Sequence, residues 1–292
     1  MTKIFQSFAV RLLAGSFMLF GLCAPAQASM FTSETPAPTA ALPQPAPVQT
    51  PVISSPPAMG FMLEIISEPH QEQTAEHPFR VLIYHTHTYE AFTATEAYPY
   101  TATEKWRTGN PQRNVVALGA YLSELLTQAG MSVTHDTAAY EPPTLSSAYE
   151  RSLKMLEKRS SDGEVYDLYI DLHRDAYSEG NGPNTVENGG EEIARLMFLI
   201  GKGTGQTGAG YDVKPDYESN LTIAQLLTNR LNMQVDNLCR PVKVKTGRYN
   251  QHIAPRCVLI EVGNNHNTLE EALCAMPYLA NAICSLSDGQ IE

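Results

Sequence analysis

A short apolar run that ends in two histidines and a carboxylate is the feature that most constrains this chain. Val81–Tyr84 is brief, apolar and preceded by Pro78, a pattern typical of a buried strand, and His85, His87 and Glu90 follow it. Residues two apart share a face of a strand, so we expect the imidazoles of His85 and His87 to point the same way. Open α/β sheets bind ligands just beyond the carboxyl ends of their strands. The stretch therefore predicts a ligand site.

Two later apolar runs also end in residues of this kind. The run 166–172 leads into His173, and the run 257–260 leads into Glu261. Between the first and second runs, 114–126 has the spacing of an amphipathic helix and 131–134 that of a strand, which predicts parallel strands joined by a right-handed crossover. The sequence predicts an α/β domain of three layers, with a mostly parallel central sheet flanked by helices.

The remaining elements are expected to complete this pattern. Helices are expected at 147–159, 220–233 and 268–286, and strands at 194–200 and 242–245. Thr268 is expected to cap the last helix, with Glu270 and Glu271 in its first turn. Cys274 and Cys284 would then lie ~15 Å apart along one helix, too far for a disulfide, and we expect free thiols.

The polar residues that follow these strands have the chemistry of a hydrolytic metal site. The carboxyl ends of parallel strands meet at one edge of a sheet, so residues distant in sequence can converge there. A catalytic zinc ion requires three nitrogen or oxygen ligands, an open position and a carboxylate base. We expect His87, Glu90 and His173 to bind zinc. Glu261 is expected to be the base, because a carboxylate within an apolar strand is costly unless it is paired or functional.

Each of these residues also has a purely structural explanation. The histidines after the first strand could be loop residues that only form hydrogen bonds. His173 could take part in a salt bridge without any metal. Glu261 could pair with Arg248 or Arg256. Convergence of all the candidates at one sheet edge favours a site.

Other side chains near these strand ends are expected to bind substrate or to hold the ligands in place. Asp171 could orient a ligand imidazole, His85 could replace His87 as a ligand, and Tyr249 could line a substrate groove. The full set of supporting residues comprises His85, Asp171, Arg174, Arg248 and Asn250.

The first part of the chain is expected to lie outside the folded domain. Residues 1–28 combine a basic start, an apolar stretch shorter than the ~20 residues of a membrane span, and an A-x-A pattern, which predicts a signal peptide or a membrane anchor. Residues 29–60 are proline-rich and predict a disordered linker. The catalytic domain is expected over 78–288, facing the cell wall outside the cytoplasm. The net charge of −11 and the absence of a basic run argue against a nucleic-acid partner.

Five motifs, spread over about residues 80–285, together resemble the stage II sporulation protein P family. They are His85-Thr-His87-Thr-Tyr-Glu90, Asn114-Val-Val, Asp171-Leu-His173-Arg-Asp175, Gly247-Arg-Tyr-Asn-Gln251 and Leu259-Ile-Glu261-Val-Gly-Asn-Asn-His-Asn-Thr-Leu-Glu-Glu271. The resemblance implies an amidase-like (phosphorylase/hydrolase-like) fold. It also implies a zinc-dependent N-acetylmuramoyl-L-alanine amidase that acts on peptidoglycan during engulfment, with a lytic transglycosylase like stage II sporulation protein D as partner.

The same resemblance implies roles for individual residues. His87 and His173 look like the zinc imidazoles, and Glu261 looks like the catalytic carboxylate. Amidases of the wider group often carry a ligand glutamate near the start of the first helix. Residues 112–114 hold no carboxylate, so Glu90 takes the third position.

Two other functions remain compatible with the sequence. His87-x-x-Glu90 followed by His173 also resembles a zinc carboxypeptidase, in which Arg174 or Arg248 would bind the terminal carboxylate of a peptide. A non-catalytic protein that binds the cell wall is the second alternative.

Overall fold

The computed structural model describes residues 78–177, 180–208 and 210–287, all within one compact unit, His70–Glu292. The expected export segment and proline-rich linker lie outside the described residues. Within the described ranges, none of the helices combines the length and apolar character that crossing a membrane requires.

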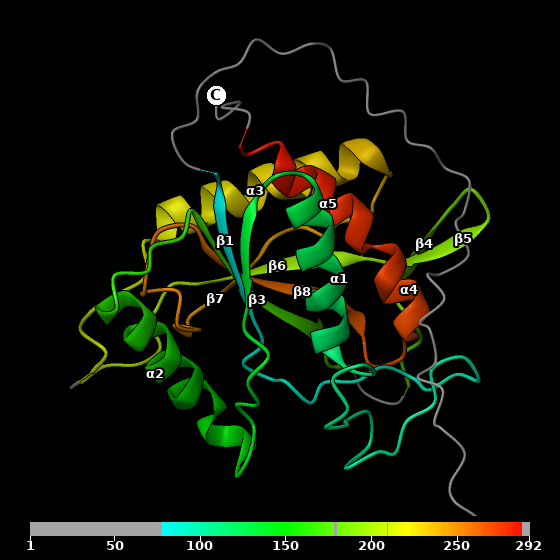
Figure 1. Ribbon diagram of the computed structural model, residues 1–292, viewed down its shortest axis with the longest axis horizontal. Helices are drawn as coiled ribbons and strands as arrows, with labels where there is room; N and C mark the ends of the chain where they lie inside the picture. The colour runs from blue at the N-terminus through cyan, green and yellow to red at the C-terminus, as the bar shows by residue number, and fades with distance from the viewer. Residues whose placement is uncertain (1–77, 178–179, 209, 288–292) are drawn as a thin grey trace, which may run out of the picture. The chain divides into compact units, whose positions relative to one another are not determined.

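The centre of the fold is a six-stranded sheet in the order β2-β1-β3-β8-β6-β7 (Figure 1). Its strands are β1 (Arg80–Tyr84), β2 (Ser132–His135), β3 (Leu168–Asp175), β6 (Leu196–Gly201), β7 (Lys243–Lys245) and β8 (Cys257–Asn264). Adjacent strands pair in parallel except β6 and β8, which are antiparallel. A separate antiparallel hairpin is formed by β4 (Thr185–Asn188) and β5 (Glu191–Ala194). The predicted α/β class with a mostly parallel sheet is confirmed.

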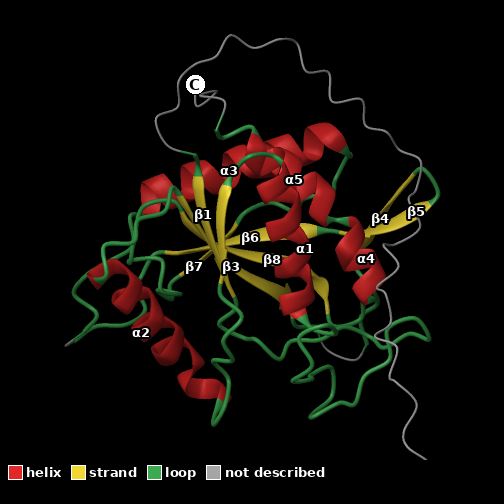
Figure 2. Cartoon of the chain, in the orientation of Figure 1, coloured by secondary structure: helices red, strands yellow, loops and turns green. Residues whose placement is uncertain are grey.

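Helices cover both faces of this sheet (Figure 2). The larger core packs one face against α1 (Val115–Gln128), α3 (Tyr217–Gln234), α4 (Leu269–Cys274) and α5 (Met276–Cys284). The opposite face packs against α2 (Ala148–Ser161), which follows the short 3-10 turn η1 (Leu145–Ser147). Side chains alternate along each strand: Val81 and Ile83 belong to the larger core, and Leu82 and Tyr84 to the smaller one.

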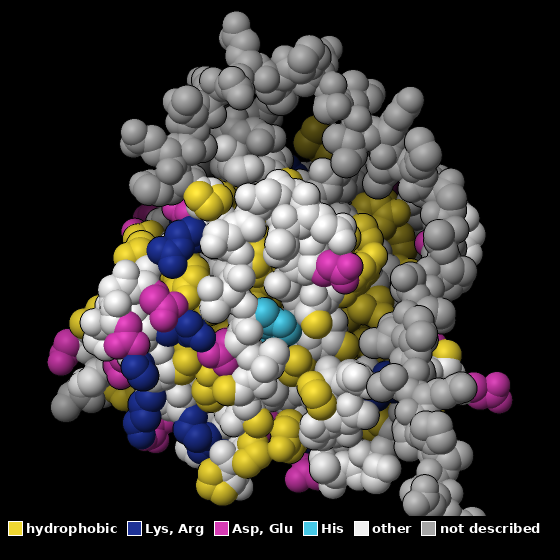
Figure 3. Space-filling view, in the orientation of Figure 1, with side chains coloured by type: hydrophobic (Ala, Val, Ile, Leu, Met, Phe, Trp, Pro, Cys, Tyr) yellow, Lys and Arg dark blue, Asp and Glu magenta, His cyan; other side chains and the backbone are white. Residues whose placement is uncertain are grey.

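The outer surface of α2 is charged. Lys154 lies 2.7 Å from Glu150, and Lys158 lies 2.7 Å from Asp162, both at a spacing of four residues. Figure 3 shows lysine and arginine side chains gathered over this part of the molecule, with acidic side chains among them. The helix thus turns its polar side to solvent and its apolar side, which includes Leu156, to the sheet.

The prediction of one continuous helix over 268–286 is wrong, because this segment forms two helices, α4 and α5, that are separated at Ala275. Pro277 lies in the first turn of α5, where a backbone N–H has no partner within the helix and its absence costs nothing. In the interior of one long helix, the same proline would remove a backbone hydrogen bond. The predicted cap is confirmed, since the Thr268 side chain accepts from the Glu271 backbone and Glu271 reciprocates. Cys274 and Cys284 lie on different helices, and neither forms a disulfide within the described residues.

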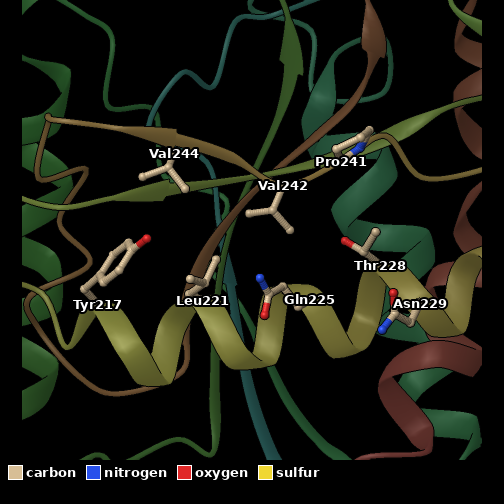
Figure 4. A pocket seen from close by; sticks show the side chains of 8 residues that line it. All are labelled: Tyr217, Leu221, Gln225, Thr228, Asn229, Pro241, Val242 and Val244. Atoms are coloured by element: carbon tan, nitrogen blue, oxygen red, sulfur yellow. The ribbon is translucent and has the colours of Figure 1, made fainter.

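A shallow pocket of about 490 Å³ lies between α3 and the edge strand β7. In Figure 4, Tyr217, Leu221 and Gln225 of α3 face Val242 and Val244 across this pocket. None of its lining residues is a histidine or an acid, so the pocket lacks the groups that a hydrolytic site requires.

Candidate active site

The first strand ends at Tyr84 as expected, but strand geometry does not continue through the two histidines that follow it. β1 stops at Tyr84, and Asp171 of β3 then binds Thr86 twice, accepting from its backbone N at 2.8 Å and from its Oγ1 at 2.7 Å. These bonds turn the chain between His85 and His87. The expectation that both imidazoles leave the same face is therefore wrong.

His85 points toward α1 and is fully buried. Its Nδ1 lies 2.9 Å from the carbonyl oxygen of Leu172, and its Nε2 lies 2.9 Å from Nε2 of His135. Because a carbonyl oxygen only accepts, Nδ1 of His85 carries the hydrogen, and Nε2 of the neutral ring accepts from Nε2–H of His135. His85 cannot reach a substrate. It supports the backbone of β3 one residue before His173.

Acidification is expected to destabilise the fold through this imidazole pair. Burial, and then the neighbouring ring of His135, lower the pKa of His85 to about 3. Burial lowers the pKa of His135 to about 4. A histidine in the unfolded chain titrates near ~6.5. Below ~6.5 the unfolded chain binds protons that the folded chain does not. The free energy of unfolding should therefore fall as the pH drops, by about 2 kcal/mol per ring at pH ~5.

Urea unfolding at pH 7.5 and pH 5.0 measures this loss. The variant His135→Gln keeps an N–H donor toward His85 but does not titrate, so its loss should be clearly smaller. An equal loss in both proteins would contradict the assignment.

Four residues expected at the site do meet, on the face of the sheet that α2 covers. His173 and Glu261 are register partners on the neighbouring parallel strands β3 and β8. The rings of His87 and His173 lie 5.3 Å apart, edge to face. Glu90 places Oε2 3.2 Å from Nδ1 of His173, and the same oxygen accepts from the Arg174 backbone N. Residues from three strand ends thus surround one point.

The electrostatics of this cluster favour a cation at its centre. Burial lowers the pKa of His173, but the Asp171 and Glu90 carboxylates outweigh it and hold that pKa well above its ordinary value. Burial raises the pKa of Glu90, but Arg174 and His173 bring it down to about 2. For Glu261 burial dominates and raises the pKa to about 8. The carboxylates that hold a proton on His173 would also stabilise a metal ion.

The cluster also contains two residues, Glu141 and Tyr149, that no sequence pattern had indicated. Nδ1 of His87 lies 3.6 Å from Oε1 of Glu141, whose other oxygen forms an ion pair with Arg107. The ring of Tyr149 lies 5.4 Å from that of His87. Glu141 precedes two prolines in a loop and Tyr149 lies within the first turn of α2, so neither position follows an apolar strand, the signal that revealed the other residues.

Asp171 and Arg174 occupy supporting positions. Oδ1 of Asp171 lies 2.7 Å from Nε2 of His173, and its carboxylate also holds the turn at Thr86. Arg174 is buried, where its guanidinium donates to the carbonyl oxygens of Ala91 and Trp106 and lies 3.7 Å from Glu90. Arg174 is therefore unavailable to a substrate carboxylate, and the carboxypeptidase hypothesis loses one of its two arginines.

Arg248 and Asn250 lie in the loop that faces α2. Asn250 is buried and donates from Nδ2 to the carbonyl of Tyr149 at 2.8 Å and to Oγ of Ser152 at 3.0 Å, so it joins the loop to the helix. Arg248 lines a hollow beside Tyr149. In the described part of the chain, no ion pair joins Glu261 to Arg248 or Arg256.

The donor chemistry around His87 and His173 fits zinc. At this site Nδ1 of His87 and Oε2 of Glu261 are buried without a hydrogen-bond partner, whereas Nε2 of His173 is paired with the Asp171 carboxylate. Such orphaned atoms are costly unless an ion or water satisfies them. Across residues 78–177, 180–208 and 210–287, no three histidine, cysteine or acidic side chains already stand in a ligand arrangement. The atoms that a metal ion requires are therefore present, but they are not already arranged as a set of three ligands.

The sequence matches a known protein family. The model of the family "Stage II sporulation protein P (SpoIIP)" matches residues 48–284. The chain belongs to this family. Stage II sporulation protein P of Bacillus subtilis (strain 168) is 24% identical over 205 residues, which cover 65% of this chain and 47% of that protein. The chain thus spans about half the length of the family member it matches.

Solved structures with a similar arrangement are amidases. The CwlD amidase of Clostridioides difficile, solved in complex with the GerS lipoprotein, is 14% identical in sequence to this chain and superposes with a TM-score of 0.44. The match covers 70% of this chain and 94% of the CwlD chain. The N-acetylmuramoyl-L-alanine amidase AmiC2 of Nostoc punctiforme is 12% identical, with 71% and 93% covered and a TM-score of 0.42. Similarity at this level is too low to transfer a residue or an activity.

Proposed function

We propose that this protein is a peptidoglycan hydrolase that cleaves the amide bond between N-acetylmuramic acid and the L-alanine of the stem peptide. The observation that carries the proposal is the pairing of His173 and Glu261 across β3 and β8, with His87 beside His173 and a buried, unpaired oxygen on Glu261. Imidazoles and a desolvated carboxylate at one sheet edge are the groups that hydrolysis of an unactivated amide requires.

Glu261 is the proposed proton carrier. Its buried carboxyl, whose pKa is raised to about 8, can take a proton near neutral pH and release it again. In amide hydrolysis it would accept the proton of the attacking water and deliver it to the departing amine of L-alanine. Oε2 has no other hydrogen-bond partner to compete for that proton.

The other residues hold and orient the reacting groups. His87, His173 and Glu90 are the proposed zinc ligands, with Glu141 as an additional carboxylate beside His87. Bound zinc would polarise the scissile carbonyl and lower the pKa of water. Burial, then the charges of Asp171 and Glu261, raise the pKa of the Tyr149 hydroxyl well above its ordinary value. Tyr149 therefore stays protonated and can donate a hydrogen bond to substrate.

We also propose the setting of this reaction. Family membership supports a role in sporulation, on peptidoglycan outside the cytoplasm, with a lytic transglycosylase like stage II sporulation protein D as partner. The N-terminal residues would export the chain or anchor it to the membrane.

Product analysis by mass spectrometry tests the proposed bond. Purified peptidoglycan is digested with the full chain, with and without a chelator and with the transglycosylase present. We expect intact stem peptides that begin with L-alanine, and we expect chelation to reduce their release by at least about 100-fold through loss of the metal's charge stabilisation. Zinc added back should restore release, and metal analysis of His87→Ala and His173→Ala should show less bound zinc.

The remaining outcomes identify the alternatives. Shortened stem peptides that stay attached to glycan would indicate a carboxypeptidase. Unchanged muropeptides, with or without the transglycosylase, would indicate a protein that binds the wall without cleaving it. Release that a chelator does not affect would contradict the zinc assignment.

A further inference from the structure

A hollow of about 770 Å³ opens beside the candidate active site, between the start of α2 and the loop 246–250. Its volume falls within the ~300–1,000 Å³ of pockets that bind small molecules. The residues that characterise its walls are Tyr149, Leu153, Tyr211, Arg248, Tyr249 and Asn250.

Two tyrosines connect this hollow to the reacting groups. The ring of Tyr149 lies 5.4 Å from that of His87 and 5.8 Å from that of Tyr249. Burial and then the charge of Glu261 raise the pKa of Tyr249, and Glu261 contributes in the same direction at Tyr149. A molecule in the hollow would therefore lie directly beside the bond-breaking centre.

The wall that carries Tyr249 is rigid. Tyr249 and Asn250 both have left-handed backbone conformations, with φ of 48° and 54°, and the side chain of Asn250 bonds to the backbone of Tyr149. A Cβ on Gly247 would lie 2.6 Å from the Tyr249 ring, and one on Gly201 would lie 2.8 Å from it. Two consecutive left-handed residues that are not glycine cost energy, and such conformations cluster at binding sites.

Arg248 contributes the only positive charge among the residues that line the hollow. It is largely buried, with Cζ 4.6 Å from the centroid of the Tyr211 ring and Nη1 donating to the carbonyl of Gly210 at 2.5 Å. A guanidinium has five N–H donors, and among the described residues this is the only hydrogen bond that the Arg248 side chain donates. Glu150, the acidic residue of the lining, pairs with Lys154 instead.

We infer that this hollow is a subsite for the stem peptide, in which Arg248 binds a peptide carboxylate and Tyr149 and Tyr249 flank the peptide backbone. The inference rests on the proposed function for the identity of the peptide. A planar, partly desolvated guanidinium suits a carboxylate because it can form two parallel hydrogen bonds. A stem tetrapeptide with L-lysine at its third position, which serves as the probe, offers two such groups: the α-carboxylate of D-glutamate and the C-terminal carboxylate.

Calorimetric titration of the full chain with a free stem tetrapeptide tests the subsite without any need for catalysis. Three peptides are used: one with both carboxylates free, one with the D-glutamate α-carboxylate amidated, and one with the C-terminus amidated. We expect one of the two amidations to raise the Kd ~10- to 100-fold, as loss of a charged hydrogen-bonded pair does. Arg248→Gln should raise the Kd for the free peptide by a similar factor and should be insensitive to that amidation.

Arg113→Gln is the matched control. Arg113 also donates to backbone carbonyls and lies over a tyrosine ring, that of Tyr98, but it is not among the residues that line the hollow. Its variant should bind all three peptides as the original chain does. If Arg248→Gln alters the melting temperature, the binding of the three peptides to the unmodified chain still decides whether the protein recognises a peptide carboxylate.

The outcomes separate this inference from the proposed function. Equal binding of all three peptides by the unmodified chain would overturn the subsite, even if amide cleavage is observed. Binding that depends on Arg248 and on one carboxylate would support the subsite, even if product analysis identifies a different cleaved bond.

Discussion

Replacing Glu261 with glutamine is expected to lower kcat for amide cleavage by roughly 10²–10⁴-fold, because the amide cannot accept the proton that a general base must take. The fold should be little affected. Glutamine preserves the shape of the side chain, and the buried, metal-free site already disfavours a charged carboxylate, since burial raises the pKa of Glu261 to about 8. The charge of a bound cation would favour the carboxylate form that acts as the base. We expect the free energy of unfolding to change by less than about 1 kcal/mol.

Release of stem peptides and thermal unfolding, measured on the same preparations, check this prediction. Glu192→Gln is the matched control, since Glu192 is a strand glutamate that is exposed on β5. It should keep full activity. Retention of kcat within fivefold by Glu261→Gln would show that another group carries the proton, and Glu141, which lies beside His87, would be a candidate.

Replacing Gly119 with alanine is expected to destabilise the protein by about 3 kcal/mol, although alanine is normally the better helix former. Gly119 lies in the middle of α1, directly over the imidazole pair. A Cβ at this position would lie 2.5 Å from Nε2 of both His85 and His135. The added methyl group must therefore push the two rings apart and break their hydrogen bond, or lift the helix from the sheet. His85 also holds the carbonyl of Leu172, so the strand end that carries His173 should shift and activity should fall.

Urea unfolding measures this effect, and Ala120→Gly is its counterpart on the exposed side of the same helix. That control should lose only the ~1 kcal/mol of helix propensity. Adding His135→Ala to Gly119→Ala should recover part of the loss, since the smaller side chain makes room for the methyl group. A Gly119→Ala protein as stable as the original would contradict the close packing of α1 on this pair.

The sequence identified the strand ends where the candidate site lies but not all of the side chains that form it. His87, His173 and Glu261 follow or lie within apolar runs, so hydrophobic pattern alone located them. Tyr149 and Glu141 lie on a helix and in a loop from a different part of the chain. They reach His87 because α2 packs on the sheet face that carries His173 and Glu261, and the pattern of one segment contains no information about which face a distant helix covers.

The sequence by itself determined the local conformations, because hydrophobic periodicity, turn residues and helix caps each depend on only a few neighbouring residues. The strands β1, β3 and β8, the helix α1 and the cap at Thr268 follow from such signals. Only the tertiary structure decided the antiparallel direction of β6 beside β8 and the divergence of His85 from His87. Both depend on hydrogen bonds between segments remote in sequence. Asp171 lies 85 residues beyond Thr86, and its two bonds to that residue decide that His85 enters the core while His87 faces the site.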